Sequence, residues 1–235
     1  MANRTAEILT RVQTIMRSRT DQYAPAYEMQ SNFRIASDQL LNSLIGPIFQ
    51  YRDQRPSPIY SSQSTSDIDN LLSSFRTIIE YTLENAEQQI WAPNETPVTS
   101  VGRQIFKYED WQVYGYSIHF PPQNQLNLYL NSRINYPVYE EPYGQDVGNG
   151  RIKVWPSPTG GEKITAMVIA GDPDINVEFL PGTQTINPDP AVTTQTLWTQ
   201  RAYDSLVYLI VGLFGIEIMA PPLIQAIMQQ KAQSL

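Results

Sequence analysis

Cysteine is absent from the 235-residue chain, and histidine occurs only once, as His119. The lack of cysteine excludes a disulfide framework, a thiolate nucleophile and a zinc site built on cysteine. His119 stands between Ile118 and Phe120, in a segment that we expect to be a strand. Nothing around it in the sequence has the signature of a catalytic triad or a metal site. We therefore interpret His119 as an ordinary strand residue.

Long apolar runs are also missing. The longest apolar stretch, 206–216, is flanked by Arg201, Asp204 and Glu217. It is well short of the ~20 residues that span a bilayer. The first residues, Met-Ala-Asn-Arg-Thr-Ala-Glu-Ile-Leu-Thr-Arg, lack the apolar core of a secretory signal peptide. We expect a chain that is made in a cytoplasm and does not enter a membrane.

Charged residues are few, at 17% of the chain against about a quarter in an average domain. Amides replace them, with 21 Gln and 13 Asn. An amide-rich surface forms hydrogen bonds without strong charge, which suits broad self-associating contacts as well as a plain exterior. The net charge of −7 and the absence of a basic stripe argue against a nucleic-acid clamp.

No catalytic motif stands out. Carboxylates occur as near neighbours in several places, but adjacency in sequence does not create the spacing that a glycosidase needs. Gly148-Asn-Gly150 is not followed by Gly-Lys-Ser/Thr, so it is not a phosphate loop. We predict no catalytic residue, no cofactor and no metal site. The carboxylate pairs are Glu109-Asp110, Glu140-Glu141, Asp172 with Asp174, and Asp67 with Asp69.

Helical spacing of apolar residues predicts four helices, the last being the organising element of the chain. In the third, Ser66 and Asp69 form a capping box. Pro221-Pro222 forbids continuation of the fourth. The predicted helices cover residues 5–18, 31–45 (ended or kinked by Gly46-Pro47), 66–90 and 193–219.

From Pro97 to Pro181 the apolar period changes to two, which predicts strands. The best pair is 151–155 with 162–170, joined by the turn-forming sequence Pro156-Ser-Pro-Thr-Gly-Gly, and we interpret it as a hairpin. The predicted strands cover 104–108, 113–120, 126–130, 151–155, 162–170 and 175–180.

These patterns predict an α+β fold in which a helical bundle carries a β-rich insertion domain and extended terminal segments. The bundle is expected to comprise 1–96 with 189–220, and the β-rich domain 97–188. Residues 221–235 form a C-terminal tail, whose short amphipathic segment is too short to be stable alone.

The element order resembles that of the head-to-tail adaptor proteins of tailed bacteriophages. The likeness is carried by Arg151-Ile-Lys-Val-Trp-Pro-Ser-Pro-Thr-Gly-Gly, by Gly171-Asp-Pro, and by the helix that follows Asn187-Pro-Asp-Pro. In particular, the chain is similar to the ring proteins stacked beneath the portal of short-tailed and crAss-like phages.

The resemblance implies a non-enzymatic virion protein at the head–tail junction. It would form a homo-oligomeric ring, usually of twelve copies, against the phage portal protein and neighbouring tail or ring proteins. DNA would pass through its lumen without sequence-specific binding. The tail, and the first helix, would match the family's terminal segments that extend onto adjacent rings. The candidate partner-binding residues of the tail are Pro221, Pro222, Leu223, Ile224, Ile227 and Met228.

Two alternatives remain open. The β-rich region could be a carbohydrate- or surface-binding module of a virion or cell-surface protein, because exposed aromatic rings suit sugar stacking. Its candidate residues are Trp111, Tyr114, Tyr116, Tyr136 and Tyr139. An enzyme would require a pocket with converging carboxylates.

Overall fold

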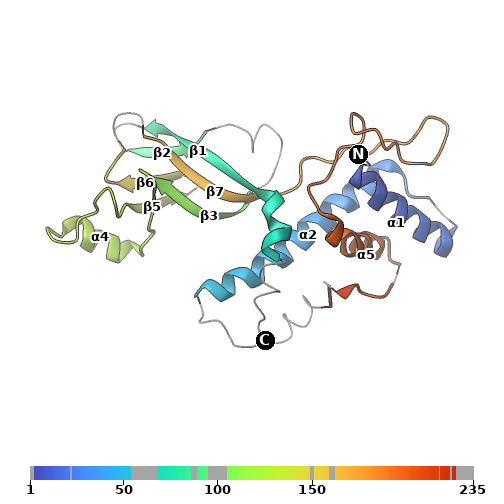
Figure 1. The fold of residues 1–235 in the computed structure, drawn as a ribbon, viewed down its shortest axis with the longest axis horizontal. Coiled ribbons are helices and arrows are strands. Elements are labelled where there is room, and N and C mark those ends of the chain that lie inside the picture. The colour runs from blue at the N-terminus through green and yellow to red at the C-terminus, as the bar shows by residue number, and fades with distance from the viewer. Residues whose placement is uncertain are drawn as a thin grey trace. The chain divides into compact units, whose positions relative to one another are not determined.

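The computed structural model divides into two compact units. Unit 1 comprises Met1–Phe75 and Gly171–Leu235, and unit 2 comprises Arg76–Ala170. Figure 1 shows the helices α1, α2 and α5 of unit 1 and the sheet of unit 2. The structure describes residues 3–21, 23–53, 68–85, 89–94, 105–148, 151–158, 162–216, 218–222, 224 and 225.

Unit 1 is built on α1 (Arg4–Thr20), α2 (Ala26–Asp53) and α5 (Tyr203–Leu213), and α5 packs against both others. The Asn3 side chain caps α1 by accepting a hydrogen bond from the Ala6 N–H. The buried side of α1 includes Ile8, Leu9, Val12 and Met16, as the spacing predicted.

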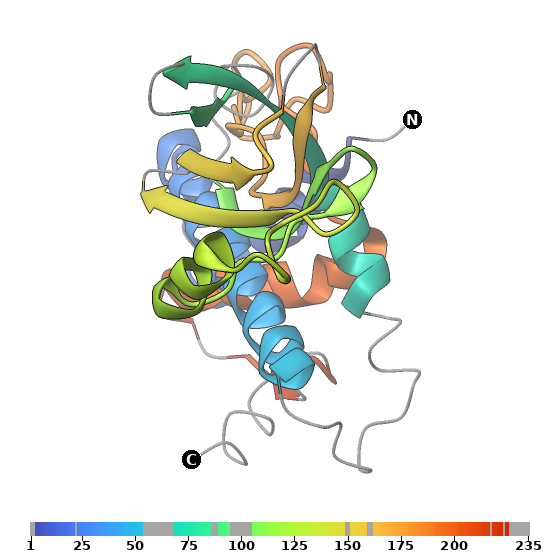
Figure 2. The ribbon, with the colours of Figure 1, turned by 90° about the vertical axis from the view of Figure 1, so that its left-hand side faces the viewer.

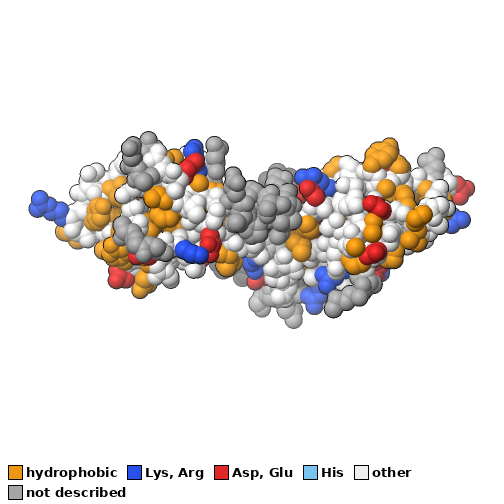
Figure 3. Space-filling view, turned by 90° about the horizontal axis from the view of Figure 1, so that it is seen from above, with side chains coloured by type: hydrophobic (Ala, Val, Ile, Leu, Met, Phe, Trp, Pro, Cys, Tyr) orange, Lys and Arg blue, Asp and Glu red, His pale blue; other side chains and the backbone are white. Residues whose placement is uncertain are grey.

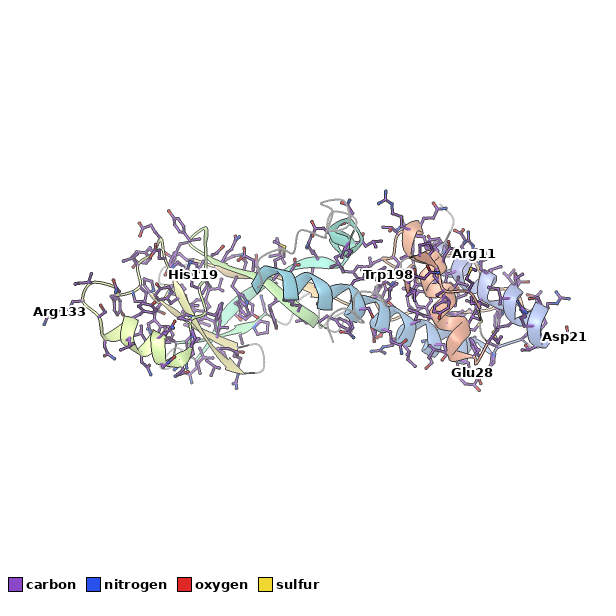
Figure 4. The ribbon with its side chains drawn as sticks, turned by 90° about the horizontal axis from the view of Figure 1, so that it is seen from below. Arg11, Asp21, Glu28, His119, Arg133 and Trp198 are labelled. Carbon is purple, nitrogen blue, oxygen red and sulfur yellow. The ribbon has the colours of Figure 1, made fainter. Side chains whose placement is uncertain are left out.

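A buried polar network joins the segment after the sheet to α2. The Asp172 carboxylate accepts hydrogen bonds at 2.8 Å from the hydroxyls of Ser37 and Thr196 and from the Leu197 N–H. The indole Nε1 of Trp198 donates to Ser37 Oγ, also at 2.8 Å. Trp198 is fully buried, and Figure 4 shows it among the helices of unit 1. The network therefore holds the 172–198 segment on the helices.

Unit 2 contains a seven-stranded sheet whose neighbouring strands are all antiparallel. The strand order is β4-β3-β7-β1-β2-β6-β5, and the sheet curls towards a half-barrel (Figure 2). The strands are β1 (Arg76–Asn85), β2 (Ile90–Pro93), β3 (Ile105–Val113), β4 (Tyr116–Ser117), β5 (Tyr143–Gly148), β6 (Arg151–Trp155) and β7 (Ile164–Ala170).

The predicted fold class, a helical bundle carrying a β-rich insertion, is wrong. The chain is α+β, with the seven-stranded antiparallel sheet as a principal element beside the helices. The main cause is the third predicted helix, 66–90. Among the described residues of this segment, only 68–72 and the short turn η1 (Ser73–Phe75) are helical, and the chain then forms β1 and β2. The predicted cap at Ser66 lies outside the described residues.

The predicted hairpin of 151–155 with 162–170 is also wrong. Both segments form strands, β6 and β7, but β1 and β2 lie between them in the sheet. β6 pairs with β5 and β2, whereas β7 pairs with β3 and β1. The turn-forming sequence therefore connects strands that lie apart in the same sheet.

Several smaller predictions need correction. The predicted strand 126–130 lies in helix α4 (Gln123–Asn131), and 175–180 contains only an isolated bridge from Phe179 to Ile186. Of the helix predicted over 193–219, the described residues form only the turn η2 (Gln200–Ala202) and α5. The helix predicted over 31–45 is longer than expected, because α2 continues past Gly46-Pro47, where the sequence predicted an end or a kink, to Asp53.

The core of unit 2 lies on one face of the sheet. In β1, Ile79 and Tyr81 are buried while Ile78 is exposed, as expected of alternating side chains in a strand. In β7, Ile164, Ala166 and Val168 are fully buried. These side chains share a cluster with residues from β2, β3 and β6.

Gly144 on β5 lies too close to its neighbours for any larger residue. A Cβ atom there would lie 2.6 Å from Phe120 Cε1 and 2.8 Å from Ile118 Cγ2. We expect Gly144→Ala to lower the free energy of unfolding by about 1–3 kcal/mol, because both side chains must move. Denaturant titration measures this. Gly212→Ala in α5, where the new Cβ meets open space, is the control and should be neutral or stabilising.

None of the helices in the described parts of the chain combines the length and the apolar character needed to cross a membrane. α5, which contains most of the longest apolar stretch, has 11 residues.

Candidate functional site

The predicted partner-binding tail is described only at its start. Pro222 is exposed, whereas the side chain of Ile224 is 6% exposed. The Gln225 N–H donates to the Pro221 carbonyl at 3.0 Å, and the Gln225 side chain donates to the Ala220 carbonyl at 2.7 Å. The start of the tail is thus a folded turn. Leu223, Ile227 and Met228 lie outside the described residues, so partner binding by the tail remains a prediction.

A second candidate surface lies on unit 2, where α4 and the loop after it connect β4 to β5. Pro122 precedes the first residue of α4, and Leu126, 1% exposed, anchors the helix. The ring of Tyr129 lies 5.0 Å from that of Tyr143 on β5. These contacts fix α4 against its unit.

The loop after α4 is also ordered by local hydrogen bonds. Ser132 Oγ accepts hydrogen bonds from the N–H groups of Ile134 and Asn135. Farther on, the Glu141 N–H donates to the Val138 carbonyl at 3.1 Å, which closes a turn. The loop therefore presents its side chains from a defined backbone.

This region exposes an unusual number of large apolar side chains. Ile134 is 93% exposed and Leu128 is 71% exposed, while the others are exposed by two-fifths to a half. Figure 3 shows apolar side chains at the surface of this unit, which occupies the left half of the picture. We call the set the tip surface. It comprises Phe120, Leu128, Ile134, Tyr136, Val138 and Tyr139.

The aromatic residues predicted to bind sugar are divided between core and surface. Trp111 packs against Tyr81, Tyr108 and Phe120, with ring centroids 4.8, 4.9 and 5.5 Å away. Trp111 is therefore part of an aromatic cluster rather than a free stacking platform.

The remaining four of these aromatic residues lie nearer the surface. Tyr114 packs edge-on against Tyr139 at 4.9 Å, and its hydroxyl donates to the Pro156 carbonyl. Tyr116, Tyr136 and Tyr139 are about half exposed. Only these three present substantial ring area to solvent.

Burial raises the pKa of Tyr114 to about 12, with Glu162 and Tyr139 adding to the shift. Unfolded tyrosine ionises near pH 10, so the folded state holds this proton between pH 10 and 12. We expect stability to decrease as pH rises through that window. Denaturant midpoints measured across it would test this, and Tyr114→Phe should weaken the dependence. An equal slope in the variant would contradict it.

Several of the carboxylates paired in sequence have structural partners of their own. Glu109 binds Arg76 through Nε at 2.6 Å and Nη2 at 3.2 Å. Asp110 accepts from Gln112, and Asp174 pairs with Arg34 at 3.3 Å. Asp172, which neighbours Asp174 in sequence, belongs to the polar network described above.

Among the described residues, no group of three or more His, Asp or Glu side chains could hold a metal ion. The ring of His119 lies edge-on to that of Tyr143 at 6.0 Å, and its backbone bridges to β5 (Figure 4).

A hollow in unit 1 has hydroxyl, amide and guanidinium groups on its walls. It is lined by Thr10, Gln13, Thr14, Arg17, Tyr23, Gln184 and Thr185.

Sequence reasoning missed Phe120, Leu128, Ile134 and Val138 as surface residues. A signal for them was available, because Arg133 is the only charged residue between Asp110 and Glu140.

No protein-family model matches this chain, and no curated protein matches it either.

Proposed function

We propose that this chain is a non-catalytic structural protein that assembles into an oligomeric ring. The observation that supports this best is the tip surface. Covering one large apolar side chain contributes about 1.5–3 kcal/mol. In the single chain Ile134 is almost entirely exposed to water, and Leu128 is mostly exposed. Apolar patches of this kind mark association surfaces.

The identity of the ring comes from the sequence resemblance to head-to-tail adaptor proteins. In this proposal the ring lies at the head–tail junction of a virion. It binds the portal protein on one side and a tail or ring protein on the other, and twelve copies match the family's usual number. The chain would be made in the host cytoplasm.

The charge of the chain supports passage of DNA through such a ring. Each copy carries −7, so twelve copies carry −84 (12 × −7). Phosphates bind proteins through Lys and Arg, and a ring that is strongly acidic overall offers them few such partners. DNA would therefore move through the ring without being held.

Mass measurement of the purified chain, alone and mixed with the purified portal protein, tests this proposal. The expected result is a closed ring in at least one of the two samples, with cyclic symmetry visible by electron microscopy. A chain that remains monomeric in both samples would contradict it.

A carbohydrate-binding module is the second candidate, supported by the half-exposed rings of Tyr116, Tyr136 and Tyr139. A glycan array tests it. Binding that is lost in Tyr136→Ala but kept in Tyr27→Ala, an exposed tyrosine of unit 1, would favour this function over ring assembly.

A further inference from the structure

We infer that copies of this chain associate through the tip surface, with Arg133 at one end of the loop of one copy facing Glu140 and Glu141 at the other end of the loop of the next copy. The inference rests on the proposed function and names the contact through which copies would associate.

The charges around the tip surface are the first argument. Arg133, Glu140 and Glu141 are all exposed, and none of them forms an ion pair within the described residues. Figure 4 shows Arg133 on the loop after α4, pointing away from the helix. The cation and the two anions stand at opposite ends of one loop. Each copy thus offers both signs, and a second copy offers the complement.

The apolar side chains between these charges are the second argument. Ile134 follows Arg133 directly, and Tyr136, Val138 and Tyr139 complete the run up to Glu140. A second copy that pairs the charges would cover these side chains as well. An apolar centre with charges at its edge is the usual arrangement of a protein interface.

The same features disfavour other occupants. A nucleic acid would meet two carboxylates and one cation, which is a repulsive balance for phosphate. An anionic membrane surface would be repelled in the same way. A second copy supplies a cation to the two carboxylates and carboxylates to the cation without any further partner.

Charge reversal tests the inference. In Arg133→Glu the new carboxylate faces Glu140 and Glu141 of the next copy, and in the double variant Glu140→Lys/Glu141→Lys the new cations face Arg133. Each is expected to weaken self-association by about tenfold or more in sedimentation experiments over a concentration series. Lys163→Glu is the matched control, because Lys163 pairs with Glu80 of its own chain and lies outside the tip surface.

Mixing the two charge-reversal variants gives the decisive result. An alternating arrangement restores opposite charges at every contact, so the mixture should regain the association of the unaltered chain. The inference is overturned if the single variants associate normally, or if mixing restores nothing while both variants remain folded by circular dichroism.

The absence of cysteine permits a second, covalent test. Chains carrying Arg133→Cys mixed with chains carrying Glu140→Cys should form a disulfide-linked dimer under mild oxidation, whereas Thr82→Cys chains on β1 should not. If the unaltered chain forms rings but neither test responds, the tip contact is wrong and the ring proposal stands. If it forms no ring alone or with the portal protein, both are wrong.

Discussion

Replacing Trp198 by alanine is expected to lower the free energy of unfolding by about 3–5 kcal/mol. The side chain is fully buried, and its ring centroid lies 4.5 Å from that of Phe75. Truncation would leave a cavity among the helices of unit 1 and remove the donor to Ser37 Oγ. Denaturant unfolding followed by circular dichroism measures the loss.

The matched control is Trp198→Phe, which retains an aromatic ring but has no N–H group. It should cost less than alanine, because part of the buried area remains. A loss below about 1 kcal/mol for the alanine variant would mean that the core closes over the gap, contrary to the expectation.

Replacing Asp172 by alanine is expected to cost about 2–4 kcal/mol. The carboxylate accepts from Ser37, Thr196 and the Leu197 N–H, each at 2.8 Å. Hydrogen bonds to a charged acceptor are stronger than neutral ones, and removal leaves the donors without this partner. The same unfolding titration gives the loss.

Asp172→Asn serves as the control, because it retains one acceptor oxygen and should lose less than alanine. Ser37 receives the Trp198 indole N–H and donates to Asp172, so the two sites share a residue. The effects of Asp172→Ala and Trp198→Phe should therefore be coupled by about 0.5–3 kcal/mol in a double-mutant cycle. Strict additivity would contradict a common network.

The sequence predicted elements well where one local signal acted alone. α1 has a helical apolar stripe with Asn3 before it, and β6 has the limits that alternation indicated, Arg151–Trp155. In both segments the local period and the tertiary environment favour the same structure.

Prediction failed where two periods fit one segment. Residues 68–90 have apolar side chains at helical spacing, but Thr77, Ile78, Ile79 and Tyr81 are also good strand formers. Pairing of β1 with β7, about ninety residues later, decided the outcome. The sequence around β1 contains no local pattern that indicates a strand partner so far along the chain. The opposite error occurred at 126–130. Leu126, Leu128 and Leu130 alternate with polar residues, which predicted a strand, but the segment lies in helix α4.

The candidate site was predicted only in part. Tyr136 and Tyr139 were recognised as surface aromatics, but Trp111 was placed with them and instead packs in a cluster. Burial of an aromatic ring depends on the neighbouring strands, which the sequence did not identify correctly. β5 was missed because Tyr-Gly-Gln-Asp-Val-Gly has little strand propensity, and it forms at the sheet edge against β6.

The position of β7 has a consequence for how the polypeptide matures on the ribosome. β7 is the last strand among the described residues, yet it lies between β3 and β1. The centre of the sheet therefore cannot form until residue 170 has left the ribosome. The contacts of α1 and α2 with α5 can form only after that. Contacts so distant in sequence form slowly, so nascent chains should expose apolar segments for most of translation and be clients for chaperones.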